Sequence, residues 1–181
     1  NRLSLIEALT TTIPPNTSPQ AIAARLDAIE QTPPLYPRAW VIGWVAIACG
    51  AFAVLAGGRW VEFLAATAGA AFSLTVRDRL AAGRLNPIAI TVFCAAIASL
   101  LCQLIITGLG QVGLGTDTPE FGLLSSVLFL VPGVALVTAA LDLVRFDLVS
   151  GMSRLAYAIL LLTSIAVGML ITLAITGTQV I

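Results

Sequence analysis

Apolar residues recur in five long segments along most of the chain. These segments cover about 39–57, 60–76, 87–109, 121–141 and 155–176, and short polar stretches with Arg, Asp and Gly separate them. A helix needs about 17 to 25 apolar residues to cross the hydrocarbon core of a bilayer. The pattern therefore predicts an all-α, polytopic membrane protein with five transmembrane helices, preceded by a short helical leader.

The leader, residues 1–38, holds six of the nine prolines and no glycine. We predict one short helix over about 3–9 and a second over about 21–30, with a proline break between them. Ser18 is placed to cap the second helix, and Pro19 suits its first position. We expect residues 1–38 to form a cytoplasmic leader and residues 39–181 to form the membrane domain.

Two further expectations concern the ends of the leader. Pro33-Pro34 and Pro37 predict an extended connector into the first apolar segment. The chain begins with Asn rather than Met, so we expect that sequence is missing before it or that it is a segment of a longer protein.

Composition agrees with a membrane protein and excludes several functions. Hydrophobic residues make up 59% of the chain and charged residues 10%, against about 25% charged residues in soluble domains. The net charge is zero and there is no His, which argues against nucleic-acid binding and against His-based catalysis or metal binding. Cys49, Cys94 and Cys102 lie in apolar segments, where thiols pack as small apolar groups. We therefore expect no enzyme activity, no cofactor and no metal site.

The arginines predict an orientation. Eight of the nine lie in the leader or in the two loops after the second and fourth segments, and only Arg59 lies on the other side. By the positive-inside rule, the N-terminus is cytoplasmic and the C-terminus of this chain lies outside.

Polar side chains inside the apolar segments are the first candidates for a solute pathway. Glu62 lies near the outer end of the second segment, where it either faces the pathway or pairs with Arg59. Gln103 in the third segment either bonds a neighbouring helix or contacts a solute. Ser126 adds a hydroxyl to the fourth segment.

Pro132-Gly133 lies in the middle of the fourth apolar segment. Proline removes a backbone donor, and with glycine it kinks or breaks a helix. Many secondary transporters use broken helices at this depth to present backbone groups to a solute. A passive kink is the alternative.

The loop after the fourth segment carries a balanced group of charges. Asp142, Arg145, Asp147 and Arg154 either form a cytoplasmic gate of ion pairs or belong to a solvated loop. Asp142, at the end of the segment, is the member best placed to face a pathway.

Several short motifs resemble the threonine/serine exporter family. They are ARLDAIE at 24–30, PPLYPR at 33–38, GGRW at 57–60 with an acidic residue at 62, LNP at 85–87, VPGVAL at 131–136 and DLVSGMSR at 147–154. These motifs follow one another over nearly the whole chain.

The resemblance implies a secondary exporter of small hydrophilic amino acids, threonine or serine, driven by the proton gradient in a bacterial-type inner membrane. It also implies that the chain is the N-terminal, five-span half and that a second half of opposite topology lies in the same chain or in a partner subunit. Some two-subunit relatives are linked to dicarboxylate export, so succinate is a rival solute.

On this basis, we expect Pro132 and Gly133 at the solute site, and Glu62 or Asp142 as the group that takes the coupling proton. A structural or assembly subunit without its own solute site is the alternative, because charges are scarce within the spans.

Overall fold

The structure, a computed structural model, describes residues 2–12, 14, 17–33, 35–83 and 85–177. All the regular elements in this part of the chain are helices, as the sequence predicts. Two compact units are present, Asn1–Val41 and Ile42–Ile181. Pro34 of the predicted connector and one arginine of the loop after the second apolar segment, Arg84, lie outside the described residues.

The first unit contains α1 (Arg2–Thr12) and α2 (Pro19–Glu30), which pack against each other. Ser18 caps α2 as predicted, because its hydroxyl accepts a hydrogen bond from the backbone N–H of Ala21 at 3.3 Å. Pro19 is the first residue of the helix, where its missing N–H costs nothing.

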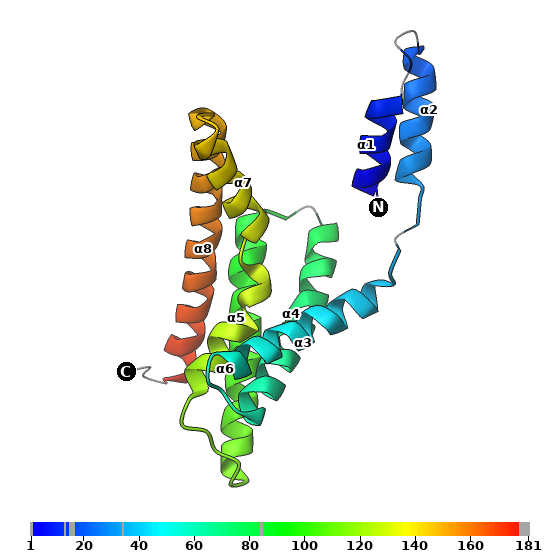
Figure 1. Ribbon diagram of the computed structural model, residues 1–181. Helices are drawn as coiled ribbons and strands as arrows, with labels where there is room; N and C mark the ends of the chain where they lie inside the picture. The colour runs from blue at the N-terminus through cyan, green and yellow to red at the C-terminus, as the bar shows by residue number, and fades with distance from the viewer. Residues whose placement is uncertain (1, 13, 15–16, 34, 84, 178–181) are drawn as a thin grey trace. The chain divides into compact units, whose positions relative to one another are not determined.

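The second unit begins within α3 (Arg38–Leu55) and continues through α4 (Trp60–Ala82) and α5 (Pro87–Gln111). Three shorter helices follow, namely α6 (Pro119–Ser126), the 3₁₀ helix η1 (Leu128–Leu130) and α7 (Gly133–Val144). The last helix is α8 (Leu148–Thr176). Helix α5 packs against both α4 and α8, α6 packs against α4 and α5, and α7 packs along α8 (Figure 1).

Two helices start where capping residues place them. The Asn86 side chain accepts from the backbone N–H of Ile88 at 2.9 Å, and Pro87 begins α5 as predicted. Helix α8 starts at Leu148, earlier than the predicted residue 155, because the Asp147 carboxylate accepts from the N–H of Ser150 and caps the helix there.

Small residues bring the central helices close together. A Cβ atom added at Gly69 on α4 would lie 2.6 Å from the carbonyl oxygen of Ala98 on α5. A Cβ atom added at Gly168 on α8 would lie 2.5 Å from the carbonyl oxygen of Val92 on α5. Likewise, α3 crosses α4 at Gly50, where an added Cβ would meet the Thr67 side chain. Close backbone approach of this kind is typical of helix packing in lipid.

Hydroxyl groups add hydrogen bonds between the same helices. Ser73 on α4 donates to the carbonyl oxygen of Cys94 on α5 at 2.7 Å. Thr172 on α8 donates to the carbonyl oxygen of Ala96 on α5 at 3.0 Å and bonds the Ser99 hydroxyl at 2.8 Å. These bonds fix the register of α5 against both neighbours.

The helical structure of the fourth apolar segment is interrupted at Pro132-Gly133. The segment Pro119–Leu130 and helix Gly133–Val144 meet there at an angle of 66°. Val131 has extended backbone, and Pro132 precedes the first turn of α7. Of the two outcomes that the sequence left open, the structure has a break.

The number of membrane spans is less clear than predicted. In the described part of the chain, α3, α5 and α8 are long and apolar enough to cross a membrane, and the bent pair at the break makes a fourth if it counts as one span. Helix α4, the second predicted span, does not meet this criterion despite its 23 residues. It carries charged residues at both ends, Glu62 near its start and Arg77, Asp78 and Arg79 near its end, and it is less apolar on average than α3, α5 and α8.

We predict that Gly168→Ala destabilises the protein, because the added methyl group meets α5 backbone and the Ala95 side chain at 2.7 Å or less. Overpacking of this kind costs about 1 to 3 kcal/mol. Gly108→Ala on α5 is the matched control, because no atom lies within 4 Å of its added Cβ. Thermal unfolding in detergent measures both. Equal melting temperatures for the two variants would contradict this packing.

Candidate functional site

A partly enclosed cavity lies beside the broken helix. Its volume is about 300 Å³, at the lower end of the range for small-molecule sites. Four elements and the break surround it: the end of α4, the start of α5, η1 and the middle of α8. The lining residues are Arg77, Ala81, Leu85, Pro87, Ile90, Thr91, Phe129, Leu130, Val131, Pro132, Tyr157 and Leu161.

The side chains that line the cavity are apolar except for three, and among the described residues Arg77 carries the formal charge. Thr91 already donates its hydroxyl to the carbonyl oxygen of Pro87 at 2.8 Å. Arg77 is exposed and has no hydrogen-bond or ion-pair partner among the described residues, and no Asp or Glu of this part of the chain lines the cavity. A negative group that enters the cavity therefore meets a guanidinium that no carboxylate of the described chain neutralises.

A second, more open hollow of about 490 Å³ also borders Pro132. It is lined by residues 131–135 at the start of α7, by Thr138 and by Arg154 from α8. Val131 and Pro132 border both spaces. Both hollows thus meet the break, and the described lining of each includes one arginine.

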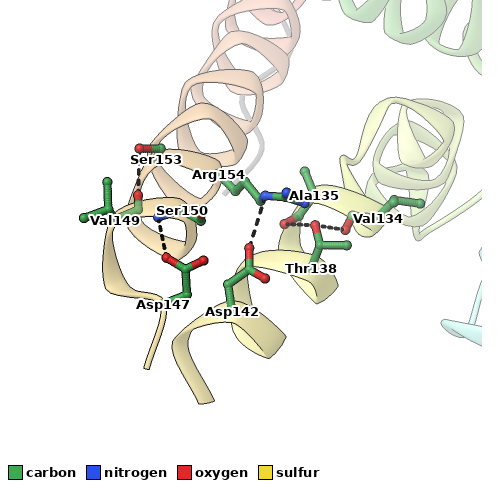
Figure 2. Close-up of polar contacts among 9 residues, drawn as sticks. All are labelled: Val134, Ala135, Thr138, Asp142, Asp147, Val149, Ser150, Ser153 and Arg154. Atoms are coloured by element: carbon green, nitrogen blue, oxygen red, sulfur yellow. Dashed lines mark hydrogen bonds and ion pairs between the residues drawn. The ribbon is translucent and has the colours of Figure 1, made fainter. Parts of the chain in front are cut away.

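Arg154 is paired, unlike Arg77. Its Nε lies 3.1 Å from Oδ2 of Asp142, and the two side chains are 53% and 22% exposed (Figure 2). The pair joins α7 to α8. Because both groups reach solvent, the pair contributes little to stability, about 0 to 1 kcal/mol.

The other two charges of the predicted gate do not join this pair. Asp147 caps α8 and lies on the neighbouring turn (Figure 2). Arg145 follows the last residue of α7, and its backbone N–H donates to the carbonyl oxygen of Leu141 at 3.1 Å. The structure therefore brings together Asp142 and Arg154 and gives the Asp147 carboxylate a capping contact instead.

Glu62 lies at the opposite end of α4 and is fully buried. Its Oε2 accepts from the backbone N–H of Arg59 at 2.7 Å, and its Oε1 accepts from the hydroxyls of Thr116 and Thr118. The sequence left open whether Glu62 pairs with Arg59. The contact is with the Arg59 backbone, and among the described residues no ion pair joins the two side chains. The carboxylate therefore ties the loop before α6 to the start of α4.

Gln103 and Ser126 are also buried but border neither hollow. The Ser126 hydroxyl donates to the carbonyl oxygen of Leu123 within its own helix at 2.7 Å. Of the predicted site residues, Pro132, Gly133 and Arg154 line these two hollows, and Glu62 lies in a different part of the unit.

Sequence reasoning missed Arg77 and Tyr157 as lining residues. Arg77 served there only to set the orientation. Its spacing carried a further signal, because residues four apart share a helix face, and Ser73, one turn before it, is buried against α5. Pro132 and Gly133, which the sequence predicts at the break, do lie beside these hollows.

Comparisons with known proteins agree with the resemblance seen in the motifs. A family model described as "Putative threonine/serine exporter" matches residues 1–176. The chain is similar to "Probable succinate transporter subunit YjjP" of Escherichia coli (strain K12), with 33% identity over 150 residues, which is 78% of this chain and 54% of that protein. It is also similar to the protein of the same description in Klebsiella aerogenes, with 27% identity over 146 residues, 78% of this chain and 54% of that protein.

The chain thus spans about half the length of the curated relatives that it matches. No solved structure matches it. Since the family model covers nearly all of the sequence, the predicted family is confirmed, and the chain belongs to the threonine/serine exporter family of membrane transporters.

Proposed function

We propose that the chain is one half of a secondary exporter for a small carboxylate solute, a dicarboxylate of the succinate type. The observation that carries this proposal is the partly enclosed cavity at the helix break, whose described lining has one guanidinium without an ion-pair partner and no acidic side chain. Broken helices beside a cavity are the usual place for solute binding in secondary transporters.

The charge of the cavity favours an anion over an amino acid. A carboxylate moved out of water needs a cationic or hydrogen-bonding partner, and Arg77 supplies one. Threonine and serine also carry an ammonium group, which needs an anionic partner of its own. No Asp or Glu lines the cavity to provide it.

Threonine or serine remains the second candidate, because the description of the matching family names these solutes. The names of the two curated relatives support succinate instead. A scaffold without a solute site is the weakest interpretation, since a scaffold has no need of an unpaired arginine beside a broken helix.

The proposed transporter has five membrane spans in this chain, because α4 also crosses the membrane although it does not meet the span criterion. This helix is 23 residues long, and it packs along α5, which meets the criterion for a span. The N-terminus is cytoplasmic and the C-terminus of this chain lies outside, as the arginine distribution favours. A second half, in the same chain or in a partner subunit, completes the solute pathway in the inner membrane.

Glu62 is the better of the two candidates for the coupling proton. Its carboxylate is fully buried and holds the loop before α6, so protonation would weaken the contacts that close this end. Asp142 is partly exposed and already paired with Arg154. Proton coupling through Glu62 thus offers a direct link between the gradient and an opening movement.

We predict that vesicles holding the complete transporter lose labelled succinate faster when a proton gradient is applied. Threonine and serine should leave no faster than from vesicles without the protein. Gradient-driven loss of either amino acid without loss of succinate would overturn the choice of solute. No flux of any of the three from folded protein would contradict the exporter proposal itself.

We also predict that Glu62→Gln abolishes the effect of the gradient while succinate exchange across the membrane continues, because the variant cannot bind and release the proton. Asp117→Asn is the matched control, since Asp117 is exposed between Thr116 and Thr118, and Asp142→Asn tests the other candidate. Both Asp117→Asn and Asp142→Asn should keep the response to the gradient. If Glu62→Gln only lowers the melting temperature and stays gradient-driven, the residue is a structural latch.

A further inference from the structure

We propose that Arg77 is the residue that binds a carboxylate of the solute, in the cavity between α4, α5, η1 and α8. This inference rests on the proposed function and assigns solute binding to one site. Among the described residues, the guanidinium of Arg77 is the charged group that lines the cavity. Its planar donors match the two oxygens of a carboxylate, so a bidentate contact is available.

The backbone under Arg77 is held in place on both sides of the cavity. One turn before Arg77, the Ser73 hydroxyl donates to the carbonyl oxygen of Cys94 at 2.7 Å and joins α4 to α5. One turn after it, Ala81 lines the cavity from the same helix face. On the facing side, the Asn86 cap fixes the start of α5. A cation held by fixed helices loses little freedom when it binds an anion, which favours affinity.

Tyr157 on α8 is the second polar group available to the solute. Its hydroxyl is able to donate a hydrogen bond, while the rest of the lining beyond Thr91 is apolar and suits the carbon chain of the solute. Arg154 is the less suitable arginine, because its hollow is open and the Asp142 carboxylate already occupies its Nε.

The simpler explanation of Arg77 is a cation that anchors the end of α4 at the membrane surface. Arg79 separates the two explanations, since it lies two residues further along α4 and is exposed like Arg77, but does not line the cavity. A surface anchor predicts the same effect for both arginines, whereas a solute site predicts an effect for Arg77 alone.

The first test measures solute binding separately from transport. Cys49, Cys94 and Cys102 are buried, so a cysteine introduced by Ala81→Cys is the thiol that a water-soluble maleimide reaches. In the complete transporter, succinate at ten times its half-protecting concentration should slow alkylation about tenfold. Ala82→Cys, which is exposed outside the cavity, is the control and should react at the same rate with and without succinate.

Protection of Ala81→Cys should disappear when Arg77→Gln is added and remain when Arg79→Gln is added. In efflux assays, Arg77→Gln should raise the KM for succinate about 10- to 100-fold, as expected for the loss of a charged hydrogen bond. Tyr157→Phe should raise it less, and Arg77→Lys should recover part of the loss. The melting temperature of each variant shows whether it folds. If Arg77→Gln does not fold, Arg77→Lys is used in its place.

Three results would overturn the assignment of Arg77. They are protection that survives Arg77→Gln, equal effects of Arg77→Gln and Arg79→Gln on the KM, and unprotected Ala81→Cys in a transporter that exports succinate. In each case the exporter proposal stands, because wild-type efflux tests it separately. Absence of succinate efflux from the wild-type transporter would instead contradict the proposed function.

Discussion

The close approach of α5 to α4 and α8 is the constraint on which the rest of the structure depends. In lipid, apolar side chains gain little by leaving their surroundings, so helix association relies on packing and on interhelical hydrogen bonds. Gly69 and Gly168 allow the backbones to touch, and the Ser73 and Thr172 hydroxyls bond the α5 carbonyls at the same contacts. Once the three helices are fixed in this way, the broken segment has a rigid wall against which to form a cavity.

The break at Pro132-Gly133 is tolerated because it lies against the packed helices α4, α5 and α8. Proline at 132 leaves the carbonyl groups before it without the usual helical donors, and the chain leaves its helical path at Val131 with an extended backbone. Such backbone is tolerated at membrane depth only where protein or water surrounds it. The two hollows that border Pro132 provide that environment, and an arginine lines each of them.

Local patterns predicted much of the fold. Ser18, Asn86 and the Pro132-Gly133 pair each did what their own backbone chemistry dictates, so the helix ends and the break were readable from short stretches. Contacts between distant segments were not readable in the same way. The Glu62 carboxylate meets hydroxyls more than fifty residues away, and Arg77 faces residues of η1 and α8. Helix α4 lies between these cases, because its small, weakly apolar residues indicate helix packing as much as a membrane span.

Phe129 connects the first apolar helix to the cavity. Its side chain packs against the cluster formed by Ala46 and Cys49 of α3 and Ala70 of α4, and it also lines the cavity. Through this one aromatic ring, α3 is in contact with the wall of a space that α3 itself does not line.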